Sequence, residues 1–580
     1  MATETIVSPG VLLQEIDKSF ITPGTDPSGL AIIGPAVRGP IEIPTLIQNY
    51  NDYKNVFGTT LASASNAYEF FTSITVKNYF QNGGSTALVT RVVPTAADWK
   101  HASSSLITAQ SSSTATNQPF ILETLGKGQL LNNFGTDLEF TGGGLKTGSK
   151  DNVRFEISNV NTSNGTFTVS IRRGDDTTVS PLVLEQFTNC SLDPLSPNYI
   201  GQKIGDQVLS NDGTNVIVTG EYPNKSQFVR VKDIKPTYQY LAPDGSVAIS
   251  DSTLVTYSAS LPLPQSGTFG AGAGNNVNAG QTFGSSVTGT NIQGLAVGDY
   301  TIAITTLKNK EEFKFKTLVV PGLNYSVATH ATVMDTIIAN TTERGDSFFV
   351  ADLVPHGSTV STAKTQAESL DTSYAASYWP WAQVKSTELG RNVDCPASVV
   401  IPGVFSKNDS IAAPWFAPAG LTRGGITNVV KVEKKLSKAQ RDDLYTSKVN
   451  PLATFPGQGI VVFGQKTLQQ ASSALDRVNV RRLLLDVKDT IGGFSRKLVF
   501  EQNTQQTRDR FIRQATPYLE SLVQRQGLYA FQVKMDGQLN TSDIIDENKL
   551  VGQVFLQPTK TAEFVVLDFT ITPTGASFTD

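Results

Sequence analysis

The chain has 580 residues, of which 39% are hydrophobic and 17% charged, with 47 basic and 51 acidic side chains and a formal net charge of −4. Because a nucleic-acid backbone attracts proteins with a surplus of lysine and arginine, this balance argues against nucleic acid as a partner. The two cysteines, Cys190 and Cys395, lie far apart and predict neither a disulfide framework nor a metal site.

The N-terminal segment, residues 1–27, is predicted to be an extended arm. Residues 11–16 can form one short strand, but Pro9-Gly10 and the turn-forming residues 19–27 flank it. A segment with so little apolar surface cannot fold on itself. The sequence begins without the charged and apolar regions of a signal peptide and contains no membrane-spanning apolar run. We therefore expect synthesis in the cytoplasm and no direct membrane insertion.

Residues 28–100 predict the first part of a compact α/β core. The segment 30–40 has the pattern of a buried strand closed by glycine and proline. Residues 66–80 repeat apolar side chains at helical spacing, and the glycines at 83 and 84 end that pattern. A second buried strand is expected over 86–93.

Residues 101–236 predict a β-rich insertion domain, and residues 237–315 predict a second β insertion that is rich in Gly, Ser and Thr. Short alternating strands at close spacing are typical of all-β modules. The sequence predicts such strands at 153–158, 166–173, 215–220 and 299–306.

Residues 316–560 return to an α/β pattern and are predicted to hold the rest of the core and a C-terminal domain. A strand over 316–322, a helix over 329–344 and a strand over 347–355 form a unit that favours a parallel sheet. Capping boxes that start at Ser437 and Thr467 each predict the beginning of a helix. A strand is expected between them, at 459–464.

The segment 507–526 has the clearest helical pattern of the chain. Pro517 predicts a kink and Gly527 a C-terminal stop. Residues 561–580 are predicted to be a C-terminal arm whose strand at 563–572 needs a partner edge. The apolar face of the helix comprises Phe511, Ile512, Ala515, Leu519, Leu522 and Val523.

The sequence predicts no enzyme, no cofactor and no metal site. The three histidines, His101, His330 and His356, lie in no metal-binding motif. The segment from His356 to Thr359 faintly resembles part of a serine protease motif, but no nucleophilic serine motif follows, and we interpret it as a strand end and a helix cap. The glycine-rich segment 269–275 lacks the Lys-Ser/Thr of a phosphate-binding loop and is interpreted as a turn.

A cluster of basic residues lies between positions 477 and 497, interleaved with aspartates. We interpret it as a solvated helical face that carries internal ion pairs. The alternative is docking to an acidic protein surface. The cluster comprises Arg477, Arg481, Arg482, Lys488, Arg496 and Lys497.

The N-terminal SPGVLLQEID is followed by LAIIGPAVRGPIEIPTLIQNYNDYKNVFG, and then by LEQFTNCSLDPLSPNYIGQKIGD at 184–206. These segments, with the later ones, resemble the contractile phage tail sheath family, in the order that the family shows. LVVPG at 318–322 and RGDSFFVADLVP at 344–355 resemble the central unit. The C-terminal part matches best, with VVIPGVFSKNDSIAAPWFAPAG, LYTSKVNPLATFPGQGIVVFGQKTL, VNVRRLLLDVKDTI and LVFEQN, and with EFVVLDFTI near the end.

This resemblance implies a fold and a role. The fold would be a conserved α/β (α+β) core from the N-terminal part and the C-terminal third, with outward all-β insertions and extended terminal arms. The chain would polymerise as stacked rings around an inner tail tube in the virion and contract to drive the tube through the host envelope. Its partners would be further copies of itself, the tube protein, and the baseplate and tail terminator proteins. The alternatives are the sheath of a phage-like injection machine such as a pyocin, a β-rich adhesin and, least of all, a serine hydrolase.

Two sets of residues are predicted to form contacts. The polar face of helix 507–526, with Arg508, Arg510 and Arg513, is predicted to touch the tube; the alternative is an ordinary solvent or intersubunit contact. Because an unpaired strand edge can be completed by a neighbour, the arms are predicted to exchange strands between subunits. The exchanged residues are Val11, Leu12, Leu13, Val565, Leu567, Phe569 and Ile571.

Overall fold

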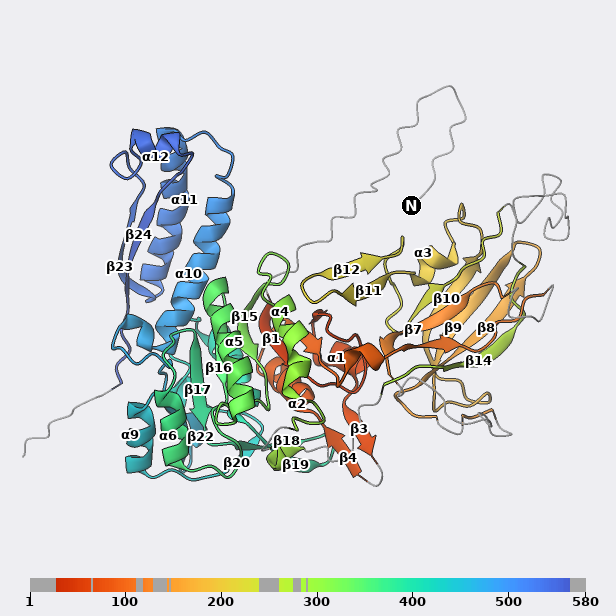
Figure 1. The fold of residues 1–580 in the computed structure, drawn as a ribbon, viewed down its shortest axis with the longest axis horizontal. Coiled ribbons are helices and arrows are strands. Elements are labelled where there is room, and N and C mark those ends of the chain that lie inside the picture. The colour runs from red at the N-terminus through yellow and green to blue at the C-terminus, as the bar shows by residue number, and fades with distance from the viewer. Residues whose placement is uncertain are drawn as a thin grey trace, which may run out of the picture.

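The computed structural model describes residues 28–63, 66–110, 118–128, 143–145, 148–238, 260–274, 283–287 and 291–563. Both predicted exchange strands, at 11–16 and from 564 onward, lie outside these residues. Figure 1 shows a central core with a β-rich unit on one side and a helical hairpin on the other.

The core is one eight-stranded mixed sheet with the order β2–β5–β1–β15–β16–β17–β21–β22. The six strands from β5 to β21 run parallel, and the two outer strands are antiparallel to their neighbours. Parallel strands covered on both faces need continuous apolar runs. All four residues of β16, Phe348–Ala351, are accordingly buried. The other strands are β1 (Ser28–Gly34), β2 (Thr45–Ile47), β5 (Ala87–Arg91), β15 (Phe315–Val319), β17 (Ala375–Trp379), β21 (Val449–Phe455) and β22 (Gly459–Val462).

Two segments far apart in the sequence, 28–91 and 315–462, build this sheet together. β1 lies directly beside β15, with Leu30 opposite Thr317, although more than 200 residues separate the two strands. The predicted α/β core is therefore confirmed. Its helices are α1 (Tyr50–Phe57), α2 (Phe71–Gln81), α4 (Thr301–Thr306), α5 (Ala328–Arg344), α6 (Val360–Glu368), α7 (Ile401–Ile411), α8 (Gly420–Arg423) and α9 (Lys438–Thr446).

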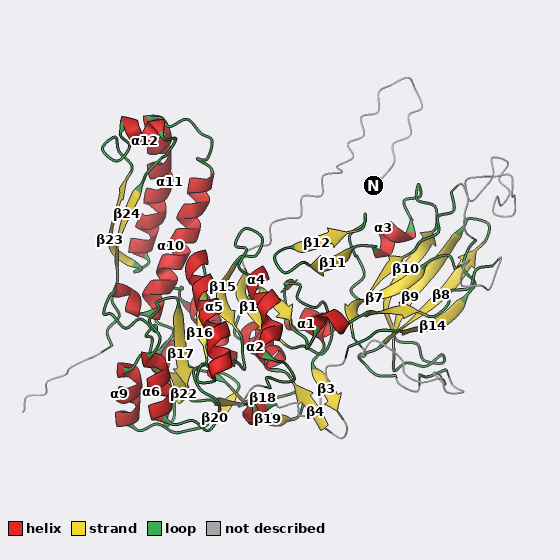
Figure 2. Ribbon diagram, viewed as in Figure 1, coloured by secondary structure: helices red, strands yellow, loops and turns green. Residues whose placement is uncertain are grey.

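The β-rich unit is a seven-stranded antiparallel sheet with the order β10–β9–β8–β14–β6–β7–β13 (Figure 2). Phe120, Phe155, Phe167 and Phe269 are fully buried in its core. The strands are β6 (His101–Ser104), β7 (Ile121–Lys127), β8 (Val153–Asn161), β9 (Thr166–Arg173), β10 (Val183–Ser191), β13 (Val229–Lys232) and β14 (Gln265–Gly270), and the short helix α3 spans Ile200–Ile204.

Smaller sheets accompany the two large ones. They are β3 (Thr60–Ser63) with β4 (Asn66–Glu69), β11 (Val208–Asn211) with β12 (Val216–Thr219), and the three-stranded β19–β18–β20 (Arg391–Cys395, Ala382–Ser386 and Val429–Val432). The first four residues of the helix predicted over 66–80 form strand β4 instead, and α2 begins only at Phe71.

The predicted separation of a second insertion at 237–315 does not hold where the structure describes that range. β14 lies between β8 and β6 in the same sheet as the strands of residues 101–236. The predicted strand at 299–306 was wrong, because most of this segment forms helix α4. Buried Tyr300, Ala303, Ile304 and Leu307 follow helical spacing and pack into the core.

The capping box at Ser437 was confirmed, because its hydroxyl accepts the Gln440 N–H and Gln440 bonds back to the Ser437 N–H. The one at Thr467 was wrong. The Thr467 N–H donates to the Asp476 carbonyl, and its hydroxyl donates to the Leu475 carbonyl. With these groups engaged, residues 465–477 run without an α-helix, and the next one starts at Val478.

Candidate interaction site

The C-terminal part of the chain forms a hairpin of two long helices with a two-stranded sheet beside it. α10 spans Val478–Arg496 and α11 spans Gln505–Gln524. Strands β23 (Leu528–Lys534) and β24 (Gln553–Pro558) pair antiparallel, and the short helix α12 (Ser542–Asp546) lies between them. Leu483, Leu519, Leu522 and Leu528 form a separate apolar core for this unit.

The sheet of β23 and β24 is open at both edges. Within the described residues, each of the two strands pairs only with the other. Phe531 and Leu556 pack toward the helices, whereas Tyr529 and Phe555 are exposed. A two-stranded sheet of this kind presents unpaired N–H and C=O groups along both outer edges. The unit can therefore accept a further strand at either edge.

A tight turn sets the direction of β23. α11 ends at the cap residue Arg525, and Gln526 adopts a positive φ of 62°. The Gly527 N–H donates to the Leu522 carbonyl and the Gln526 N–H to the Val523 carbonyl, which is a Schellman motif. The predicted stop at this point is confirmed, but the left-handed residue is Gln526 and not Gly527.

The root of the C-terminal arm is held by a cluster around Glu563, the last described residue. Arg477 donates Nε and Nη2 to the two carboxylate oxygens at 2.6 and 2.9 Å. The Tyr445 hydroxyl donates at 2.8 Å and Gln465 Nε2 at 3.0 Å. A bidentate arginine pair with two further donors fixes a carboxylate in position and orientation. The last described residue is therefore fixed to the body of the protein at a defined point.

The electrostatics of this cluster favour the ionised carboxylate. Burial raises the pKa of Glu563, but the hydrogen bonds from Arg477, Tyr445 and Gln465 act in the opposite direction, and the net result is a lowered pKa. Burial and the nearby Glu563 carboxylate together raise the pKa of Tyr445, which keeps its hydroxyl protonated as a donor. The Glu563 cluster is thus fully formed at neutral pH.

A groove of about 910 Å³ lies beside the arm root. Trp415, Phe463 and Tyr529 line it together with residues 559–563. It borders the beginning of β23, so an extended segment lying in the groove would also reach the edge of the open sheet.

The predicted tube-contact residues do not all share one surface. Arg510 is exposed and lies 3.2 Å from Glu501, and Arg513 is exposed with its Nε donating to the Asp509 carbonyl. Arg508 is buried, and its Nε donates to the Thr504 carbonyl at 3.4 Å. It thus belongs to the first turn of α11 and not to its exposed face. The predicted exchange residues Val11, Leu12, Leu13, Val565, Leu567, Phe569 and Ile571 lie outside the described residues.

The basic cluster at 477–497 is divided among several partners. Besides Arg477, which binds Glu563, Arg482 pairs with Asp409 at 2.5 Å and Arg481 donates to the Ser373 carbonyl at 3.1 Å. Arg481 and Arg482 are buried, so the interpretation as a solvated helical face was wrong for these two. Tertiary partners, which have no local signal in the sequence, replaced the expected pairs within the helix.

In the segment around His356 the predicted helix cap is confirmed, whereas the preceding strand ends earlier than predicted, at Ala351. The Thr359 hydroxyl accepts the Thr362 N–H and caps α6, and the Ser358 hydroxyl donates to the Pro355 carbonyl at 2.8 Å. In the described part of the chain, no group of three or more His, Cys, Asp or Glu residues is placed to hold a metal ion. None of the helices described has the length and apolarity needed to cross a membrane.

Comparison with known proteins places two segments of the chain in described families. Residues 293–468 match the phage tail sheath protein central domain, and residues 470–572 match the phage tail sheath C-terminal domain. The second match contains the helical hairpin, the open sheet, Arg477 and Glu563, whereas Tyr445 and Gln465 of the Glu563 cluster belong to the first match.

Similar whole proteins carry the same description. The chain is 37% identical to the tail sheath protein of Enterobacteria phage T4 over 32% of its own length and 28% of that protein. It is 30% identical to the tail sheath protein of Salmonella phage ViI over 47% of its own length and 44% of that protein. Each match thus spans less than half of the relative. The crystal structure of a sheath tail protein from Listeria innocua has a similar fold, with a TM-score of 0.51 at 10% identity over 92% of this chain and 96% of that one.

Proposed function

Because the chain belongs to the contractile phage tail sheath family, we propose that it is the structural subunit of a contractile tail sheath. It polymerises around an inner tail tube and contracts to drive that tube through the host envelope. Its location is then the tail of the virion, and its partners are further copies of itself, the tube, the baseplate and the tail terminator. The role is mechanical and requires no catalysis.

The observation that carries this proposal is the open sheet of β23 and β24 beside the anchored arm root. An open edge is completed when a strand from another chain adds its N–H and C=O groups. The arms 1–27 and 564–580 supply strands of suitable pattern in Val11–Leu13 and in residues 565–571. Each copy lends strands to its neighbours and receives strands from others, which links the copies into a lattice.

Contraction in this scheme uses energy stored in the lattice. The arms stay inserted in neighbouring sheets while the bodies rotate and repack against one another. The turn-rich residues 19–29 would connect an inserted strand to its own core. Small gains in contact per copy add up over many copies, so no bound nucleotide is needed.

The first test is whether the expressed chain forms striped hollow tubes in electron micrographs. Deleting residues 1–20 should abolish tube formation, because the donated strand is lost, while the circular dichroism spectrum and melting temperature of the body stay unchanged. A chain in which residues 1–20 are shuffled separates the effect of strand pattern from that of length. Normal tubes from the deletion variant would overturn the exchange mechanism.

A further inference from the structure

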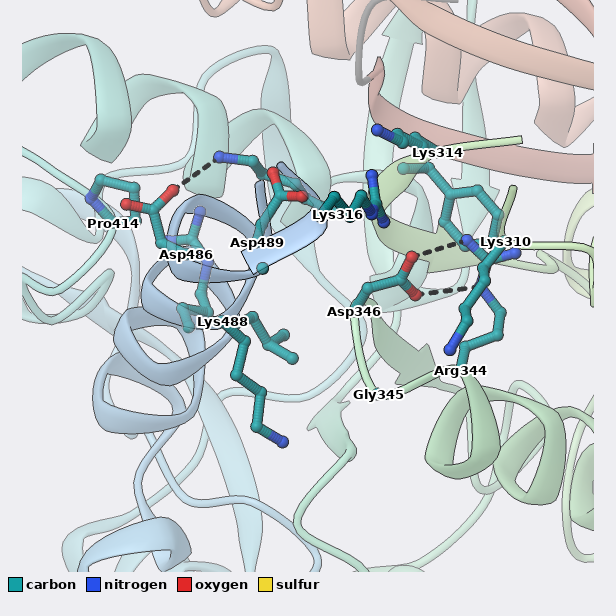
Figure 3. Close-up of a pocket in the computed structure, with 15 residues that line it drawn as sticks. Lys310, Lys314, Lys316, Arg344, Gly345, Asp346, Pro414, Asp486, Lys488 and Asp489 are labelled. Atoms are coloured by element: carbon teal, nitrogen blue, oxygen red, sulfur yellow. Dashed lines mark hydrogen bonds and ion pairs between the residues drawn. The ribbon is translucent and has the colours of Figure 1, made fainter. Parts of the chain in front are cut away.

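A basic pocket of about 280 Å³ lies in the angle between α10 and the core. Four segments line it: the residues around the start of β15, the end of α5, one face of α10, and Pro414 in the segment after α7. Figure 3 shows Lys310, Lys314 and Lys316 on one side and Lys488 on the other. The pocket is thus formed where the C-terminal hairpin meets the eight-stranded sheet, at a distance from the open sheet edge.

The lining of this pocket carries a clear excess of positive charge. Seven basic and three acidic side chains line it, which leaves four formal positive charges. Lys316 pairs with Asp486 at 2.8 Å across the joint, and Arg344 pairs with Asp346 at 3.0 Å, as Figure 3 shows. Within the pocket, these two ion pairs neutralise only two of the seven basic side chains.

Other basic groups in the pocket have capacity for a further partner. Lys310, Lys488 and Arg496 are exposed and form no ion pair with any other described residue. Arg482 is 8% exposed, and its Nη1 has no hydrogen-bond partner among the described residues, although Nη2 binds Asp409. A buried guanidinium nitrogen without a partner is costly unless an acceptor reaches it. The pocket therefore fits a partner with several carboxylates.

The same chain carries an acidic patch that matches this pocket in charge. Residues 536–548 include four acidic and no basic side chains, and all four are exposed; one of them, Glu547, pairs with the adjacent Lys549 at 2.6 Å. They surround α12, which lies at the free end of the helical hairpin and away from the core (Figure 1). The acidic patch comprises Asp536, Asp543, Asp546 and Glu547.

We propose that the basic pocket at the base of α10 receives the acidic patch around α12 of a second copy of this chain. The two patches lie at different places on one subunit, so the contact is head-to-tail and repeats from copy to copy. Such heterologous contacts generate rings or open helical assemblies instead of closed dimers. The inference rests on the proposed function and adds to strand exchange a second, electrostatic contact with its own residues.

This contact differs physically from the inserted strands. Exposed ion pairs are individually weak, and their attraction is screened over about 10 Å at 0.1 M salt. The pocket contact can therefore break and form again while the strands stay in place. It should also make assembly depend on ionic strength, whereas backbone hydrogen bonds between strands should not.

The test is a charge exchange between the two patches in the full-length chain. Lys310→Glu with Arg496→Glu should raise the critical concentration for sedimentable tubes about tenfold or more, and Asp543→Lys with Asp546→Lys should do the same, because either pair places like charges in contact. All four substitutions together should restore the critical concentration to within about twofold of the wild type and recover its salt dependence. Lys100→Glu with Lys225→Glu on the β-rich unit is the charge-matched control for the Lys310 and Arg496 pair.

The outcomes separate the alternatives. If either charge-reversed pair assembles like the wild type, or if the fourfold variant assembles no better than the pairs, the pocket contact is overturned while tube formation by the wild type still supports the sheath role. If the wild type forms no tubes, it is the proposed function that fails. If tripolyphosphate raises the melting temperature of the unassembled wild type but not of the Lys310 and Arg496 variant, and the fourfold variant is not restored, the pocket is a small-anion site and the proposal is wrong.

Discussion

A single carboxylate in the core shows how strongly burial governs this fold. Asp352 follows directly after β16 and is 4% exposed. Its oxygens accept the Ser398 N–H at 3.1 Å and the Ser398 hydroxyl. No basic side chain among the described residues forms an ion pair with it. Burial raises the pKa of Asp352 to about 7, although the hydrogen bonds from Ser398 lower it.

This pKa predicts a pH dependence of stability. The folded chain keeps the Asp352 proton up to about pH 7, whereas the unfolded chain loses it near pH 4. The folded state therefore binds more protons between these values, and the free energy of unfolding falls as pH rises through this window, by up to about 4 kcal/mol at this site. Asp352→Asn should remove this decline and stabilise the core at pH 8 relative to the wild type.

The measurement is the midpoint of urea unfolding of the unassembled chain, followed by tryptophan fluorescence from pH 4 to pH 8. Trp379 and Trp381 lie in and beside the neighbouring strand β17 and report on this part of the core. Exposed Asp543→Asn should leave the pH profile unchanged. If the unfolding midpoint of the Asp352→Asn variant falls with pH as steeply as that of the wild type, this carboxylate ionises in the folded state without cost.

Single residues also set the limit of what the sequence can predict at this scale. Gly527 was the obvious choice for the left-handed residue after α11, yet Gln526 adopts that conformation. The Schellman hydrogen bonds determine which residue adopts the positive φ. Here α11 ends one residue too early for Gly527 to be that residue, so Gln526 adopts the conformation. The stop was predictable from residue type, but its register depended on packing against Trp415, which lies about 110 residues earlier and approaches Gly527 closely.

At the scale of elements, long periodic patterns were reliable and short ones were not. The helices α5 and α11 were predicted within about two residues, because their side-chain period is repeated several times. The buried strands were located correctly, but three of them, β1, β15 and β16, end three to six residues before the predicted ends. The segment 299–306 is rich in β-branched residues and was predicted as a strand, but four buried side chains at helical spacing decided its structure. Thr467 failed for a related reason, since distant carbonyls took its donors.

The arm root is an element whose stability can be tested directly. Glu563→Gln removes the charge that Arg477 binds at 2.6 and 2.9 Å. Hydrogen bonds to a charged group contribute about 2 kcal/mol, so hydrogen exchange of residues 559–563 should become about 30-fold faster at pH 7. The folded pKa of Glu563 is lowered, so its contribution is present above the unfolded value near 4.5 and is lost as pH falls through the folded value.

The control for the arm root is Glu520→Gln, an exposed glutamate on α11 outside the Glu563 cluster. It should leave exchange of residues 559–563 unchanged. The wild-type peptide should approach the exchange behaviour of the Glu563 variant, after correction for intrinsic rates, only well below pH 4.5. Equal protection in both variants at pH 7 would mean that the arm root is held by its backbone alone.

At the scale of the whole molecule, the sequence predicted the family but not the site. The four members of the Glu563 cluster come from positions 445, 465, 477 and 563, and only folding brings them together. Their residue types are ordinary, and no local spacing marks them. The division of the basic cluster between buried pairs and an open pocket depends in the same way on Asp409 and Ser373, which belong to other segments.

The place of the subunit around a tube leads to the last prediction. Of the three arginines proposed to face the tube, only Arg510 and Arg513 are exposed on α11. Reversing both to Glu should reduce co-sedimentation of the chain with purified inner tubes about tenfold or more at low salt, because several copies per ring lose attraction at once. Arg508→Glu would instead introduce a buried carboxylate and lower the melting temperature, which marks its structural role. Lys100→Glu with Lys225→Glu controls for net charge, and unchanged co-sedimentation of the Arg510 and Arg513 variant would assign this face of α11 to solvent or to neighbouring subunits.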